Sequence, residues 1–127
     1  MIRLREARVL LRAKCYDGAY YLAGYAVECA LKACIARHTK RFEFPDKVRT
    51  QQSYTHRIGS LVEPAKLEIE LAGKLAVASS FKKNWDQVTE WSEQSRYRRN
   101  TRDDAERLVE AVEHPVHGVM TWLKQHY

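Results

Sequence analysis

Hydrophobic positions along the chain recur at steps of three and four residues, the spacing that places side chains on one face of an α-helix. A first stripe from Leu4 to Leu11 predicts a helix over residues 2–15. In the next predicted helix, residues 18–38, apolar side chains cover a much wider arc, and Asp17 is its expected N-cap. Because so wide an arc must be covered on more than one side, we place this helix at the centre of a bundle or of a dimer.

The middle of the chain interrupts this periodicity once. Residues 39–53 mix charges with Pro45 and predict a loop. A short third helix is expected over residues 54–63, where Pro64 either ends it or opens the next helix. A fourth segment, residues 65–91, carries leucines on one face and then aromatic residues toward its end.

The last helix is predicted to begin at Asp103 or Asp104, whose carboxylates suit the positive end of a helix. Apolar residues then recur at helical steps to the chain end, with Pro115 inside the pattern. Proline cannot donate a backbone hydrogen bond to the carbonyl of Ala111, so we expect a kink there. With no strand-like alternation, the pattern predicts one all-α domain over residues 1–127, an up-and-down bundle of four to five helices.

Composition and charge favour a globular protein with an anionic partner. The chain is 45% hydrophobic and 30% charged, and its 22 basic and 16 acidic side chains give a net charge of +6. That excess suits RNA, DNA or a nucleotide. The apolar run from Ala19 to Ala36 contains Glu28 and Lys32, and the N-terminus is charged throughout. We therefore expect neither a membrane span nor a signal peptide.

The sequence lacks the signatures of most catalytic and metal sites. Cys15, Cys29 and Cys34 are odd in number and form no C-x-x-C, so we expect buried free thiols in a reducing cytoplasm. No glycine-rich phosphate loop, HExxH or GxSxG motif occurs. We therefore expect a cytoplasmic protein with no metal and no cofactor.

Glu28 is the exceptional residue of the wide apolar helix. A pair with Lys32, one turn later, would contribute only about 0.3–0.5 kcal/mol if exposed. A glutamate buried so centrally needs a stronger partner, and an arginine from another helix is one candidate. We predict a structural role for Glu28 as a buried polar residue.

The stretch "SRYRRNTRDD", residues 95–104, concentrates arginines beside two aspartates. It is either a solvent-exposed turn, an anion-binding surface, or a structural connection in which Arg96 or Arg99 reaches Glu28. On an anion-binding surface, tyrosine would stack on a base and arginines would contact phosphate. The candidate RNA- or nucleotide-binding residues are Arg96, Tyr97, Arg99, Asn100 and Arg102.

The sequence "AYYLAGYAVECALKACI", residues 19–35, resembles the second helix of HEPN (higher eukaryotes and prokaryotes nucleotide-binding) domains. That helix has the form A-Y-x5-A-x-E-x2-L-K-A, and the matching positions are Ala19, Tyr20, Ala26, Glu28, Leu31, Lys32 and Ala33. Arg96-Tyr97 matches an Arg-Tyr that precedes the family's last long helix. The resemblance implies a homodimeric helical bundle that interacts with RNA or nucleotide. It also implies a minimal nucleotidyltransferase partner in a toxin–antitoxin-like module.

Active HEPN ribonucleases share an arginine, then a polar residue, with four to six residues between the arginine and a histidine. Arg99-Asn100 matches the start of this motif, but Asp104 and its two successors fill the histidine window. An aspartate cannot supply the cationic acid that imidazolium provides. This mismatch favours, as an alternative to RNA or nucleotide interaction, a non-catalytic dimeric interaction module.

Two other pairs place a histidine seven residues after an arginine. The first is Arg49 with His56, and the second is Arg107 with His114 on the last predicted helix. Residues seven apart lie near one face of a helix, so Arg107 and His114 are the candidate catalytic pair. The competing interpretation is a solvent-facing pair. A metal-independent endoribonuclease that uses Arg107 and His114 is the third functional hypothesis.

Overall fold

The computed structural model describes residues 1–38, 51 and 54–126, and all regular structure among them is helical. This confirms the predicted all-α class. The elements are α1 (Ile2–Arg12), α2 (Tyr16–Arg37), η1 (Ile58–Leu61), α4 (Glu68–Val77), α5 (Ser79–Thr89), η2 (Glu93–Tyr97), α6 (Arg102–Glu113) and α7 (Val119–Leu123), where η marks a 3-10 helix. The predicted loop at residues 39–53 lies outside the described residues, except for Gln51.

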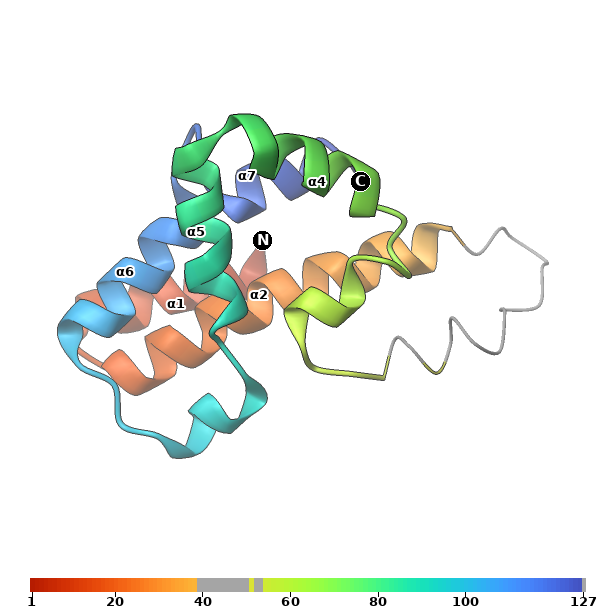
Figure 1. The fold of residues 1–127 in the computed structure, drawn as a ribbon. Coiled ribbons are helices and arrows are strands. Elements are labelled where there is room, and N and C mark those ends of the chain that lie inside the picture. The colour runs from red at the N-terminus through yellow and green to blue at the C-terminus, as the bar shows by residue number, and fades with distance from the viewer. Residues whose placement is uncertain (39–50, 52–53, 127) are drawn as a thin grey trace.

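The long helix α2 is the centre of the fold, as its wide apolar arc predicted. It runs through the middle of the molecule, and α1, α6, α7, η1 and η2 all contact it (Figure 1). Ten of its residues are buried, four of them alanines. Small side chains let the neighbouring elements approach closely. The arc is therefore covered within a single chain.

Gly24 shows how close this approach becomes. The indole ring of Trp91, between α5 and η2, lies over Gly24, and a Cβ atom added there would be 2.3 Å from the ring. The Trp91 ring also packs on Tyr21, with ring centroids 5.8 Å apart. Trp91 thereby sets the distance between α2 and the segment that leads into η2.

The two longest predicted helices of the C-terminal half are each interrupted. The segment predicted as residues 65–91 contains two helices, because Ala78 adopts an extended conformation (φ −123°, ψ 89°) that ends α4 and precedes α5. The kink predicted at Pro115 is instead a helix end. His114 is extended (φ −47°, ψ 130°), since a residue before proline is driven out of the helical region. The chain resumes a helix only at α7.

The predicted third helix at residues 54–63 reduces to the single turn η1. The N-cap of α2 also differs from the prediction, because Cys15 occupies that position and Asp17 lies in the first turn. The Asp17 carboxylate instead accepts a hydrogen bond from the backbone N–H of Asn100. This contact connects the start of α2 to the segment before α6.

The prediction of three buried thiols is wrong for Cys15, which is exposed. Cys29 is half-buried and Cys34 is buried. Cys15 lies where α1 turns into α2, next to Lys14, whose backbone is left-handed (φ 62°). A residue in such a tight connection has little neighbouring chain to cover it, and the periodicity of α1 could not show where that helix ends.

Candidate anion-binding site

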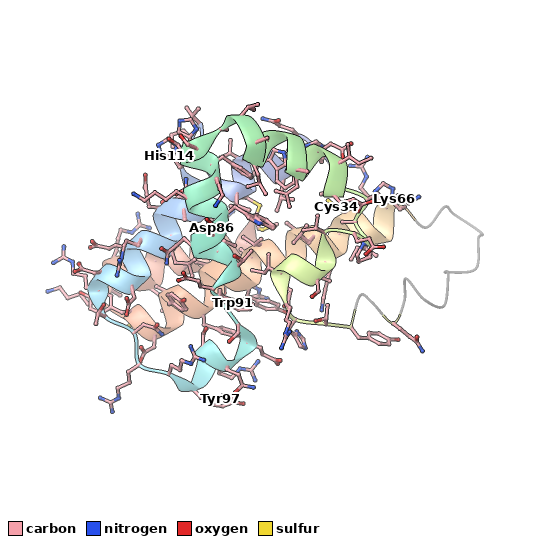
Figure 2. The ribbon with its side chains drawn as sticks, viewed as in Figure 1. Cys34, Lys66, Asp86, Trp91, Tyr97 and His114 are labelled. Atoms are coloured by element: carbon pink, nitrogen blue, oxygen red, sulfur yellow. The ribbon has the colours of Figure 1, made fainter. Side chains whose placement is uncertain are left out.

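The arginine-rich stretch forms an exposed connection between two capped helices. A capping box of Ser92 and Ser95 begins η2, and a second capping box, of Thr101 and Asp104, begins α6. The chain between them is extended at Arg98 (φ −102°, ψ 153°). Tyr97 is 75% exposed and lies at the outer edge of the molecule, away from α4 and α7 (Figure 2).

Asp104, the first residue of the expected histidine window, belongs to the capping box that begins α6. The Asp104 carboxylate accepts a hydrogen bond from the Thr101 N–H at 3.0 Å, and the Thr101 hydroxyl accepts one from the Asp104 N–H at 3.1 Å. The bond from the Thr101 backbone holds the pKa of Asp104 below its usual value, with a smaller effect from Arg107. Asp104 therefore stabilises the start of α6.

Arg96 connects η2 to the central helix. Its guanidinium donates a 2.8 Å hydrogen bond to the Tyr21 hydroxyl and lies 5.2 Å from the Tyr21 ring centroid and 5.8 Å from that of Tyr97. The hydrogen bond to Tyr21 raises the pKa of Arg96. One interpretation of residues 95–104 was a structural contact between Arg96 or Arg99 and the carboxylate of Glu28. Arg96 instead reaches α2 at Tyr21, two helical turns before Glu28.

Glu28 is buried, with 2% of its side chain exposed, as predicted. Its partner is a histidine and not an arginine: Oε1 lies 2.6 Å from Nδ1 of His56, while Nζ of Lys32 is 3.9 Å away. Arg49, which the sequence pairs with His56 by spacing, lies outside the described residues. His56 precedes η1 and brings that turn onto α2.

The second ring nitrogen of His56 faces η2. Its Nε2 lies 3.5 Å from Oε2 of Glu93, and Oε1 of Glu93 lies 3.9 Å from the Arg96 guanidinium. Three elements distant in sequence thus bring five polar side chains together. We call them the His56 cluster, and its members are Tyr21, Glu28, His56, Glu93 and Arg96.

The remaining residues of the arginine-rich stretch differ in their surroundings. Arg102 binds Glu106 at 2.7 Å, and this hydrogen bond raises the pKa of Arg102. Asn100 has a buried side-chain nitrogen without a hydrogen-bond partner in the described part of the chain. Arg98 and Arg99 are exposed, and neither forms an ion pair with any residue that the structure describes. Their guanidinium groups are accessible to an anion.

The structure does not bring Arg107 and His114 together. Arg107 contacts the Asp104 carboxylate at 3.3 Å and faces a hollow of about 480 Å³ between α5 and α6. His114 ends α6, and its Nδ1 accepts backbone hydrogen bonds from Val116 at 3.1 Å and His117 at 2.9 Å. Seven residues of helix separate the two by roughly 10 Å along the axis. Both side chains are thus engaged in local contacts.

Sequence reasoning missed Glu93 and Tyr21, and it named His56 only for its spacing from Arg49. The one signal for such a cluster was Glu28, since a carboxylate in an apolar arc requires a polar partner. Which residue supplies that partner depends on a contact across 28 positions, and nothing in the local pattern around His56 indicates it. No three described His, Cys, Asp or Glu residues are grouped as metal ligands, and no described helix is long and apolar enough to cross a membrane.

The fold and this surface define an all-helical domain whose Tyr/Ala-rich central helix meets an Arg-Tyr turn and an exposed arginine pair. The family model of the HEPN domain matches residues 2–125, so the chain belongs to the HEPN domain family. This family is generally related to nucleotides and RNA. Searches of curated proteins and of solved structures gave no match.

Proposed function

We propose that this HEPN protein binds RNA or a nucleotide through the arginine-rich stretch. The observation that carries the proposal is the exposure of Tyr97, Arg98 and Arg99 on one connection, with no ion pair to either arginine in the described chain. Accessible guanidinium groups donate paired hydrogen bonds to phosphate, and an exposed tyrosine ring stacks on a base. The net charge of +6 acts in the same direction.

Binding can be tested with a short single-stranded RNA at several salt concentrations. Replacing Arg98 and Arg99 together by alanine is expected to weaken binding roughly tenfold, because two cationic contacts to phosphate are removed. The dependence of the affinity on salt should become shallower by about one to two units of slope. Fluorescence anisotropy measures both quantities.

A matched control removes two positive charges from the other end of the molecule. Lys82, near the start of α5, and Lys124, directly after α7, are exposed. The start of α5 and α7 lie at the opposite end of the molecule from η2 (Figure 1). The double variant Lys82→Ala, Lys124→Ala should change affinity much less than Arg98→Ala, Arg99→Ala. Equal losses in the two variants would show that only net charge matters, and an unchanged affinity in both would confine the arginines to a structural role.

We also propose that the chain acts as a homodimer within a toxin–antitoxin-like module that includes a minimal nucleotidyltransferase. For the dimer, the structural support is an apolar hollow of about 280 Å³ on α1, lined by Val9, Leu10 and Leu22 with Arg5 and Glu6 at its sides. Ile2, one helical turn before Arg5 and Glu6 on α1, is 64% exposed. The partner enzyme rests on the family resemblance, and copurification with an adjacently encoded nucleotidyltransferase tests it.

A non-catalytic interaction module is the second candidate function. It is favoured by the capping role of Asp104, which leaves no histidine within the ribonuclease spacing from Arg99. Incubation of the pure protein with RNA and EDTA tests the third hypothesis, a metal-independent endoribonuclease. Cleavage that survives EDTA and disappears in His114→Ala would support the Arg107 and His114 pair, while no cleavage leaves binding or interaction as the function.

A further inference from the structure

Glu93 lies between two side chains that can both be cationic. Its carboxylate oxygens are 3.5 Å from His56 Nε2 and 3.9 Å from the Arg96 guanidinium. Charge-assisted hydrogen bonds of this kind are normally about 2.7–2.9 Å long. The Glu93 carboxylate therefore attracts both cationic groups but forms a full-strength hydrogen bond with neither. The Glu93 side chain is 40% exposed.

His56 is held so that its second nitrogen is presented to this position. In the 2.6 Å contact with Glu28, Nδ1 of His56 is the donor, because a carboxylate oxygen accepts hydrogen bonds. A carboxylate in this role fixes the orientation of an imidazole ring. Because Glu28 lies on the buried side of α2, Nε2 faces outward to Glu93 and solvent. His56 is half-exposed, at 47% of its side chain.

Arg96 is oriented by aromatic side chains in the same way. One of its nitrogens is bound to the Tyr21 hydroxyl, and its guanidinium lies beside the rings of Tyr21 and Tyr97. A guanidinium has five N–H donors, and the bond to Tyr21 uses one. Half of the Arg96 side chain is exposed. The nitrogen nearest Glu93 is the same Nη2 that binds Tyr21, and its second N–H is available on the side where Glu93 approaches.

We propose that His56 and Arg96 form a phosphate-binding site, in which the Glu93 carboxylate takes the place of the phosphate while the protein is unliganded. A phosphate offers more acceptor oxygens than a carboxylate and can receive hydrogen bonds from Nε2 of protonated His56 and from Arg96 together. Binding displaces Glu93 toward solvent. The phosphate belongs either to a free nucleotide or to an RNA backbone, with Tyr97 beside it to stack on a base.

The charges around the site explain why Glu93 is the controlling residue. The groups that face His56 are Glu28 and Glu93, while Lys32 approaches Glu28 and Arg96 approaches Glu93. Two carboxylates, one lysine, one arginine and a protonated His56 sum to a single positive charge. Displacement of Glu93 leaves two positive charges for the incoming phosphate, so Glu93 limits affinity for anions.

The proposal rests on the proposed function, and Glu93→Gln tests it separately. Gln keeps the size of the side chain but removes the competing charge, so binding of adenosine monophosphate, of the short RNA, or of both should tighten about three- to tenfold. The double variant Arg98→Ala, Arg99→Ala tests the exposed arginines independently of this site. If that variant binds normally while Glu93→Gln binds more tightly, the phosphate site stands and the wider arginine surface does not.

The matched control is Glu90→Gln, which removes an exposed negative charge near the same segment but outside the His56 cluster. Tightening limited to Glu93→Gln supports the proposal. An affinity that is unchanged or weaker in Glu93→Gln, or that rises equally in both variants, overturns it. Tightening for adenosine monophosphate alone identifies the ligand as a free nucleotide, and tightening for RNA alone identifies it as a nucleic-acid backbone.

A second variant tests His56 directly. His56→Gln removes the imidazole that would donate from Nε2, so it should weaken binding of the probe that responds to Glu93→Gln by about three- to tenfold. In the double variant His56→Gln, Glu93→Gln, the tightening caused by Glu93→Gln should be reduced. If His56→Gln fails to fold, Arg96→Lys decides: an affinity equal to that of wild type overturns the site.

Discussion

At the scale of single residues, burial separates chemically similar side chains. Glu28 is the only charged residue that is buried in the described part of the chain, and its carboxylate is compensated by His56 rather than by the nearer residue in sequence, Lys32. Removing one partner of such a pair leaves a polar group without compensation, which costs far more than loss of a surface pair. Glu28 therefore constrains which side chain can stand at position 56.

The thiols provide a residue-scale prediction. Burial raises the pKa of Cys34, which is 1% exposed, and also raises that of Cys29, whereas Cys15 is exposed. The thiolate is the reactive form, so a maleimide at neutral pH should label Cys15 first and Cys34 only after unfolding. Mass spectrometry of peptides from native and urea-treated protein checks the order. Rapid labelling of native Cys34 would contradict the packing of α2.

At the scale of elements, the approach of Trp91 to α2 is the contact that sets the position of η2. Replacing Gly24 by alanine adds a Cβ 2.3 Å from the Trp91 ring and should lower the free energy of unfolding by about 1–3 kcal/mol. Gly73, in α4, has open space around its added Cβ, so Gly73→Ala should instead be stabilising by up to about 1 kcal/mol. Urea denaturation of both variants measures the difference.

Gly24→Ala also tests whether Trp91 positions η2 in the candidate site. If Trp91 holds η2 in place, Gly24→Ala should also weaken the effect of Glu93→Gln on anion binding, since Arg96 would shift relative to His56. Gly73→Ala should leave that effect unchanged. Stability lost in Gly24→Ala without any change in binding would show that η2 is positioned by other contacts.

The start of α6 provides a pH-dependent prediction at the same scale. The Asp104 pKa is lowered in the folded protein by its bonds to Thr101, so the folded state binds its proton less readily than the unfolded chain. The stabilisation is therefore complete above about pH 4, the value for an unfolded aspartate, and is lost as the pH falls through the lowered folded pKa. Unfolding of wild type and Asp104→Asn as a function of pH should show a gap that closes in acid. Asp103→Asn, a neighbour outside the capping box, should keep a smaller and flatter gap.

At the scale of the whole molecule, the dimer proposal predicts where a charge disrupts assembly. Val9 is 50% exposed beside the apolar hollow of α1, so Val9→Arg should shift a dimer toward monomer in sedimentation at micromolar concentration. Val77→Arg is the matched control, because Val77 is 86% exposed on α4, away from that hollow. A wild-type monomer would remove the dimer proposal, and disruption by Val77→Arg alone would move the interface to α4.

Much of the architecture followed from local pattern, while the helix boundaries did not. The period of three to four residues was sufficient for the all-α class and for the central position of α2, because a wide apolar arc has no other stable location. It could not show that Ala78 is extended, or that Pro115 ends α6 rather than bending it. Those outcomes depend on how each backbone packs against its neighbours. Helical periodicity is insensitive to a single non-helical residue.

The features of the candidate site also fall into two groups, those that the sequence indicated and those that required the tertiary structure. The sequence alone determined the basic character of residues 96–102, the presence of Glu28 within an apolar helix, and the resemblance to HEPN domains. Each of these depends on residue type and local spacing. Only the tertiary structure decided that Glu28 meets His56, that Glu93 stands between His56 and Arg96, and that Asp104 caps α6. Pairings across tens of residues arise when helices pack, and packing depends on the shape and burial of the whole chain rather than on any one segment.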